Sequence, residues 1–376
     1  MNIIKNSRAY YILRYLYFYK QMGYAQFKHI FGAESFECTK DAMQKLVRAG
    51  YVEKIQKQGI NSFALTQNGY HICKRYFKPI DFCKPVRNAN TLDRVNRVNY
   101  ERFTFLQLKR KLKNNAETNK VRGWYFVPYE KEELSAQEPL AIQRVQGSTM
   151  SFALIAKNPE NRLTMYCFFF LYDQNKVFNE TTEKNMMRYI QKDYADFLNA
   201  RGFALPELQY KAVFIADSYG LIADIVKKSV QTKKQRQYQY EINGYVRTRG
   251  TIVESTFGFP SRDLYFLVND NDYSGLINRI IHLLNYDNTL CFQLNQTHCG
   301  CCVLPESSFQ QYGAAYELLV SENSRGKSFM DTKIFLADEQ IPYITYIREH
   351  YMPQERADRL NDFPVLHIDG SPIYLA

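Results

Sequence analysis

The stretch from Ser35 to Cys73 constrains the fold more than any other part of this sequence. It opens with apolar residues at helical spacing, with Ser35 as the expected cap, and Gly50 ends that helix because glycine takes the left-handed conformation without strain. Two short apolar runs follow on either side of KQGIN (57–61), which predicts a β-hairpin. Thr66 is placed to cap a closing helix. This succession predicts a winged helix-turn-helix, which lays one helix in the major groove of DNA.

The predicted recognition helix has one apolar and one polar face. The residues at core spacing are Thr39, Ala42, Met43, Leu46 and Val47. Acidic residues in the first turn face phosphate poorly, so we expect DNA contacts from the middle of the helix and from the hairpin. The expected contact residues are Lys40, Gln44, Lys45 and Arg48 on the helix, and Lys54, Lys57 and Asn61 on the hairpin.

Positive charge is concentrated in the same part of the chain. Residues 1–78 hold 13 Lys and Arg against 4 Asp and Glu, a net charge of +9, whereas the other 298 residues hold 36 against 34, a net charge of +2. A small basic module indicates a polyanionic partner, most often nucleic acid. A solvated basic face without a partner is the alternative.

The first 120 residues form a domain and a connection in this interpretation. Two helices, Ser7–Gln21 (ended by Gly23) and Tyr24–Phe31, precede the recognition helix and complete a domain over residues 1–78. Residues 79–120 are expected to be a polar linker and a long connecting helix, Thr91–Leu112. The basic end of that helix, at residues 109–113, suits the helix dipole, and a second phosphate contact is the alternative.

Residues 121–376 are predicted to form a mixed α/β domain, so the chain is α+β overall. Thr149–Lys157 and Leu163–Tyr172 are expected to be an antiparallel pair. Ala212–Asp217 with Tyr219–Lys228, and Leu264–Asn269 with Tyr273–Asn285, are strand–helix units. The remaining expected elements are strands at Gly123–Pro128, Lys333–Ala337 and Pro364–Ile368 and a helix at Thr181–Arg201. The basic stretch Lys227–Arg249 is expected to be either a mobile surface loop or a hairpin that touches nucleic acid.

An amino-terminal winged helix, the segment LDRVNRVN (92–99) and a mixed α/β domain together resemble the plasmid replication-relaxation family of mobile-element proteins. The resemblance implies a double-stranded DNA-binding protein that acts in plasmid or conjugative-element DNA processing or its regulation. It also implies a relaxase-like α/β domain with a degenerate restriction-endonuclease-like fold.

The residues expected of an active nuclease are sparse. The Asp/Glu-x-Lys spacing of a restriction-type metal site occurs once, at Asp331-Thr332-Lys333, and the central strand pair is nearly free of carboxylates. No His-x-His pair, His-x-x-Arg box or GxxxxGK[ST] loop is present. We therefore expect DNA binding without an intact catalytic site. The alternatives are a metal-dependent nuclease or relaxase, which would need a divalent metal, and a winged-helix protein-interaction scaffold.

No cofactor is expected. A zinc site at Cys291, His298, Cys299 and Cys302 is the alternative to buried reduced thiols. The scattered cysteines, with no membrane-span-length apolar run and no signal peptide, predict a cytoplasmic protein. The expected partner is double-stranded DNA, with other DNA-processing proteins or a second copy of the chain as further partners, and no membrane.

Overall fold

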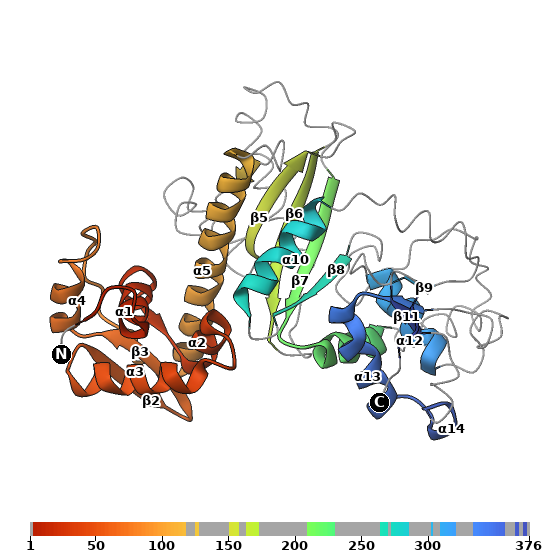
Figure 1. Cartoon of the computed structure of the whole chain (residues 1–376), viewed down its shortest axis with the longest axis horizontal. Coiled ribbons are helices and arrows are strands. Elements are labelled where there is room, and N and C mark those ends of the chain that lie inside the picture. The colour runs from red at the N-terminus through yellow and green to blue at the C-terminus, as the bar shows by residue number, and fades with distance from the viewer. Residues whose placement is uncertain are drawn as a thin grey trace. The chain divides into compact units, whose positions relative to one another are not determined.

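The computed structural model describes residues 3–117, 125–127, 150–157, 163–172, 209–229, 264–269, 272–285, 302–303, 309–320, 334–357, 365–367 and 371–373. They form a mixed arrangement of helices and several sheets (Figure 1). The chain divides into two compact units, the first made of Met1–Thr118 with Asn269–Asn278, and the second of Asn119–Val268 with Arg279–Ala376. The first unit therefore extends well past the predicted boundary at residue 78.

The first unit is built from helices around a small antiparallel sheet. Its elements are α1 (Arg8–Tyr19), β1 (Gln21–Met22), α2 (Tyr24–Phe31), α3 (Phe36–Arg48), β2 (Val52–Lys57), β3 (Ile60–Leu65), α4 (Gln67–Cys73) and α5 (Ala89–Glu117). The strand order is β1-β3-β2. The predicted second helix is confirmed residue for residue as α2, and the predicted hairpin is β2 with β3.

The chain around α1 follows the prediction at one end and departs from it at the other. Ser7 caps α1, since its hydroxyl accepts a hydrogen bond from the backbone N–H of Tyr10 at 3.2 Å. The prediction that Gly23 ends this helix is wrong: the helix stops at Tyr19, and Lys20 turns the chain with a φ of +67°. Gly23 instead stands at the start of α2, and the two residues of β1 pair with β3.

The β2–β3 hairpin is covered on both faces. On one face, Ile55 and Ala64 pack against Leu92 of α5. On the other face, the ring of Phe63 lies 4.5 Å from that of Tyr24 in α2, measured between centroids. Neighbouring residues of a strand point to opposite faces, and here both faces are covered. For this reason β3 shows no alternation of apolar and polar residues. The long helix α5 is thus an integral layer of the first unit.

Residues 74–88 cross the first unit without regular structure but are held by tyrosine side chains. The hydroxyl of Tyr17 donates a hydrogen bond to the backbone oxygen of Lys78 and accepts one from the N–H of Ile80, each at 3.2 Å. The Tyr70 hydroxyl donates to the oxygen of Ile80. The polar segment predicted as a linker is therefore fixed against α1 and α4.

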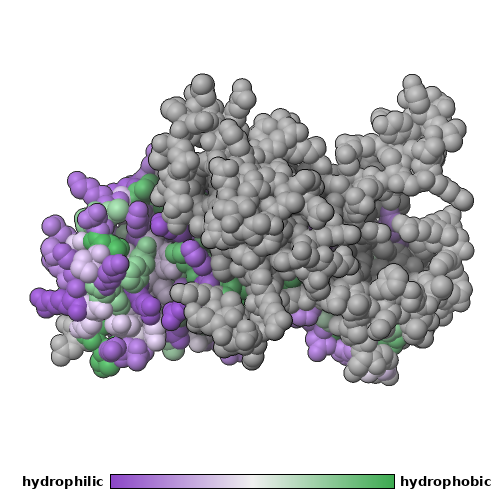
Figure 2. Space-filling view, turned by 90° about the horizontal axis from the view of Figure 1, so that it is seen from above, coloured by the Kyte–Doolittle hydropathy of each residue, from purple (hydrophilic) through white to green (hydrophobic). Residues whose placement is uncertain are grey.

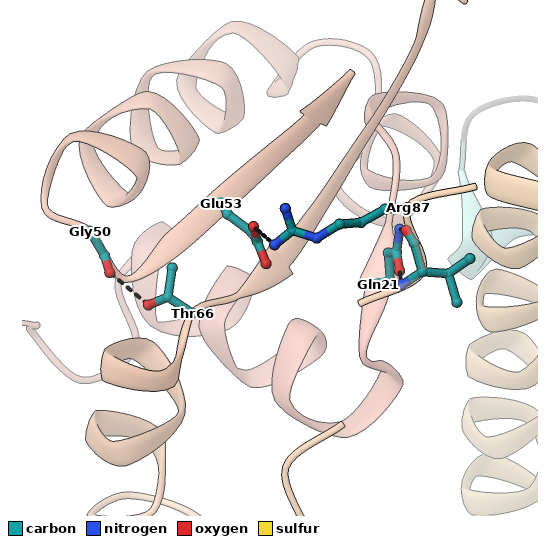
Figure 3. A network of polar contacts seen from close by, with 6 residues as sticks. Gln21, Gly50, Glu53, Thr66 and Arg87 are labelled. Carbon is teal, nitrogen blue, oxygen red and sulfur yellow. Dashed lines mark hydrogen bonds and ion pairs between the residues drawn. The ribbon is translucent and has the colours of Figure 1, made fainter. Parts of the chain in front are cut away.

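The end of the same segment is fixed against the sheet (Figure 3). The side-chain amide of Gln21 donates to the backbone oxygen of Val86 at 3.0 Å and accepts from its N–H at 2.9 Å. Arg87 forms an ion pair with Glu53 of β2 at 2.6 Å. These contacts join the start of α5 to both edge strands of the sheet.

The second unit contains a five-stranded mixed sheet of order β4-β5-β6-β7-β8. Its strands are β4 (Tyr125–Val127), β5 (Met150–Lys157), β6 (Leu163–Leu171), β7 (Gln209–Ala216) and β8 (Leu264–Val268). Strands β4, β5 and β6 pair antiparallel, as predicted for β5 and β6, whereas β6, β7 and β8 are parallel. A smaller parallel sheet joins β11 (Val365–His367), β10 (Ile334–Leu336) and β9 (Cys302–Val303).

Apolar residues fill the core of this unit. Phe169, Phe214 and Phe266, from three neighbouring strands, are at most 1% exposed and share one core with the helix over residues 219–229. The other described helices are α10 (Tyr273–Asn285), α12 (Phe309–Val320), the short 3₁₀ turn η4 (Asp338–Gln340), α13 (Ile341–His350) and α14 (Gln354–Ala357). The strand–helix units predicted at 212–228 and 264–285 are confirmed.

Several predicted features lie outside the described residues. They are the helix Thr181–Arg201, residues 230–249 of the basic loop, Asp331 with Lys333, and Cys291, His298 and Cys299 of the cysteine cluster. Within the part of the chain that the structure describes, no helix is both long enough and apolar enough to cross a membrane.

Candidate nucleic-acid interface

The helix α3 presents the polar face that the sequence predicts. Thr39, Met43 and Leu46 are buried against the rest of the first unit. Ser35 stands at the N-cap position, but its side chain makes no capping hydrogen bond. The buried hydroxyl of Thr39 donates a hydrogen bond to the backbone oxygen of Ser35 at 3.0 Å, so this polar group has a partner within the helix. The opposite face leaves Gln44, Lys45 and Arg48 exposed.

The side chain of Lys40 is placed differently from those three. Its ammonium group forms an ion pair with Glu37 at 2.6 Å, one turn earlier on the same helix. It also lies 4.8 Å from the centroid of the Phe36 ring. Beneath it, burial raises the pKa of Tyr24, and the charge of Lys40 opposes that shift. Lys40 is therefore engaged at the start of α3, whereas the other predicted helix contacts are not.

The hairpin places two of its three predicted contacts in solvent. Lys54 and Lys57 of β2 are exposed. The turn is tighter than the predicted five-residue tip, since Lys57 pairs with Ile60 across Gln58 and Gly59. Both turn residues have positive φ, +49° and +79°, as a two-residue type I′ turn requires. Helix α3 contacts β2, so the exposed lysines of β2 and the exposed polar residues of α3 lie on two elements that pack together.

Asn61 is placed differently from the two hairpin lysines. Asn61 is half-buried and pairs with Gln56, next to the pair that closes the turn. Its backbone oxygen accepts a hydrogen bond from the side-chain amide of Asn96 in α5 at 3.4 Å. Its own side-chain oxygen is buried without a hydrogen-bond partner. Ser62, next in sequence, donates to Asn96 at 2.6 Å. Asn61 is therefore tied to α5 through its backbone, and it is less exposed than Lys54 and Lys57.

Among the described residues, no ion pair or hydrogen bond engages the side chains of Lys45, Arg48, Lys54 or Lys57. Unpaired cations on neighbouring elements add their fields and attract a polyanion. We call these four residues, together with Gln44, the basic face. In Figure 2 the visible surface of the first unit is mainly hydrophilic, with smaller apolar areas.

The division of the structure sharpens the charge asymmetry of the sequence. The first unit holds 22 Lys and Arg against 10 Asp and Glu, a net charge of +12. The second unit holds 27 against 28, a net charge of −1. The excess positive charge of the chain thus lies entirely in the unit that carries the basic face.

The described residues do not assemble a metal site. No group of three or more His, Cys, Asp or Glu side chains that could hold a metal ion occurs in the described ranges. Asp331, Lys333 and most of the cysteine cluster fall in the gaps between those ranges, so the nuclease and zinc alternatives involve residues without a described position.

Comparison with other proteins gives no relative from which a function could be carried over. No family model matches this chain, and no curated protein or solved structure matches it either. Its function is therefore inferred from its own residues.

Proposed function

We propose that this chain binds double-stranded DNA through a winged helix made of α1–α4 and β1–β3. In this proposal α3 lies in the major groove, which is about 12 Å wide and admits one helix. The chain then acts in the processing of mobile-element DNA or its regulation, as its resemblance to plasmid replication-relaxation proteins implies.

The observation that carries the proposal is the basic face. It combines exposed and unpaired cations on α3 and on the hairpin, in a unit with a net charge of +12. Cations on two elements match the two phosphate backbones that border a groove, which fix a protein in register on the duplex. Gln44 directly precedes Lys45 on the helix and is also exposed, and a glutamine amide suits the paired donor and acceptor of an adenine edge.

We further propose that the second unit is a degenerate restriction-endonuclease-like domain that does not cleave DNA. Its central strands β5 (MSFALIAK) and β6 (LTMYCFFFL) contain no carboxylate at all. A restriction-type site holds a divalent metal with carboxylates on such strands. Without them, the sheet supplies a scaffold and no metal ligands from these two strands.

The test is duplex binding by the variant Lys45→Ala/Arg48→Ala at several salt concentrations. Removing two phosphate contacts should weaken binding about 10- to 100-fold and lower the slope of log affinity against log salt by about 2. The matched control is Lys5→Ala/Lys228→Ala, which removes the same charge from exposed positions outside the basic face and should bind like the wild type.

Fluorescence anisotropy with a duplex of about 30 base pairs supplies the affinities, and plasmid incubated with and without magnesium reports cleavage. Equal losses in both double variants would contradict the proposal, because net charge alone would then explain binding. Nicking of the plasmid would favour the nuclease alternative, and no binding at low salt would favour the protein-interaction scaffold.

A further inference from the structure

The first unit exposes aromatic rings on the side formed by α1, α4 and residues 74–86. Tyr76 is 47% exposed and Phe82 is 38% exposed. They stand at the two ends of a continuous row of rings in which each centroid lies between 5.2 and 6.1 Å from the next. In order, the row is Tyr76, Tyr10, Phe77, Tyr17, Tyr70 and Phe82.

Cations alternate with these rings along the chain. Lys74, Arg75, Lys78 and Lys84 are exposed, whereas the only acidic residue between positions 70 and 86 is Asp81. The ammonium group of Lys74 lies 5.7 Å from the centroid of the Tyr70 ring. We call the two exposed rings and these four cations the aromatic surface. It does not include any residue of the basic face.

The backbone that carries this surface is anchored. Tyr17 and Tyr70 hold the backbone of Lys78 and Ile80, and Gln21 holds that of Val86. A segment without regular structure that a rigid scaffold holds in place is where binding residues concentrate. The anchoring keeps Phe82 against Tyr70 with part of its ring in solvent, which avoids the entropy loss of ordering a loop on binding.

We propose that the aromatic surface binds single-stranded DNA. Unpaired bases stack on exposed rings regardless of their sequence, and a basic groove or strip follows the phosphates. A duplex hides its base faces inside the stack and cannot use such rings, so the surface selects unpaired strands. The choice of DNA over RNA rests on the proposed function of the basic face. Together the two surfaces suit DNA in which a duplex adjoins an unpaired strand.

The test uses the full chain with Tyr76→Ala and Phe82→Ala combined, and an oligo-dT of about 15 nucleotides labelled with fluorescein. Each ring that stacks on a base should contribute about 5- to 100-fold in affinity, so the double variant should lose at least about 10-fold. Binding to a duplex of about 30 base pairs should change less than about 2-fold. The variant Lys45→Ala/Arg48→Ala should show the reverse pattern.

Two controls keep the result interpretable. Ile4→Ala/Val98→Ala removes two other exposed apolar side chains of the first unit and should bind oligo-dT like the wild type. Tyr76→Phe/Phe82→Tyr keeps both rings and should do the same. The proposal is overturned if the Tyr76→Ala/Phe82→Ala variant binds oligo-dT normally, if both control variants lose as much affinity, or if oligo-U binds more tightly than oligo-dT. If the wild-type chain binds oligo-dT but does not bind the duplex, the proposed function alone is contradicted.

Discussion

Thr66 joins three parts of the first unit through one residue. Its hydroxyl donates a hydrogen bond to the backbone oxygen of Gly50 at 2.6 Å, where α3 has just ended. The hydroxyl oxygen of Thr66 also accepts a hydrogen bond from the N–H of Gly69 at 3.1 Å and so caps α4. The backbone N–H of Thr66 donates to Tyr51 at 3.1 Å. Thr66 therefore sets how the closing helix follows the helix that carries the basic face.

Thr66→Ala should loosen α4 without unfolding the chain. Loss of a capping hydroxyl costs about 0.5–2 kcal/mol, so the amides of residues 67–73 should exchange with solvent deuterium about 2- to 30-fold faster. Hydrogen–deuterium exchange read by mass spectrometry measures this. Thr66→Ser keeps the hydroxyl and both bonds and is the control. Equal protection of α4 in the wild type and in the alanine variant would refute the role of the hydroxyl.

Single residues also show where the sequence is insufficient. Spacing on a helical wheel identifies Gln44, Lys45 and Arg48 as exposed, and they are. It does not show that the neighbouring Lys40 pairs with Glu37, because the choice between solvent and an ion pair depends on side-chain conformation. Asn61 follows the turn in sequence, but its backbone oxygen is bound by Asn96 of α5, a partner 35 residues away that no local pattern reveals.

Among the elements, α5 is the one whose role the sequence indicates least. Its apolar residues predict a helix, but the polar segment before it suggests a linker. In the structure it supplies Leu92 to the hairpin core, and its Asn99 side chain donates to the backbone oxygen of Gln21 at 2.8 Å. These tertiary contacts make it part of the first unit. Helix α2 and helix α10 were predictable to the residue because turn or capping residues border them.

Leu92→Ala should destabilise the hairpin, since Leu92 is fully buried against Ile55 and Ala64. Such a truncation costs about 2–5 kcal/mol. The expected readout is faster hydrogen exchange in β2 and β3, by 10-fold or more. Val98→Ala on the same helix is the matched control, because Val98 is 52% exposed and its truncation should cost less than about 0.5 kcal/mol. If both variants exchange alike, α5 does not support the hairpin.

At the scale of the whole molecule, charge is divided unequally between the two units. The first unit carries a net charge of +12 and the second −1, a contrast that the boundary predicted at residue 78 understates. The mixed α/β class and the strand–helix order of the second unit were predictable, because buried strands form continuous apolar runs. The parallel pairing of β7 with β6 and β8 was not predictable, because the apolar run of a strand does not indicate which other strands it pairs with.

Stability of the folded chain should fall between about pH 9 and 12. Burial raises the pKa of the Cys73 thiol from 9.0 to about 12, and burial is also the main cause that raises the pKa of Tyr15 from 10.0 to about 12. The unfolded chain releases these protons first, so the stabilisation is complete below about pH 9 and is lost as pH rises through the folded-state values. Thermal melting at pH 8, 9.5 and 11 measures the decline.

Cys73→Ala serves as the comparison for that experiment. The variant lacks the thiol, so its melting temperature should depend less on pH between about 9 and 10, where only the thiol contributes. The phenol contribution above pH 10 should persist. A melting temperature that stays constant from pH 8 to 11 in the wild type would show that these groups have the same pKa in the folded and unfolded states.

The anchoring of residues 74–88 bears on how this protein can change. Tyr17, Tyr70 and Gln21 hold the segment through backbone atoms of Lys78, Ile80 and Val86. The hydrogen bonds therefore do not depend on which side chains those three positions carry. Substitutions at Lys78, Ile80 and Val86 that keep the backbone N–H groups should therefore preserve the path of the segment. The same property makes it a natural position at which to graft a new recognition sequence onto the first unit.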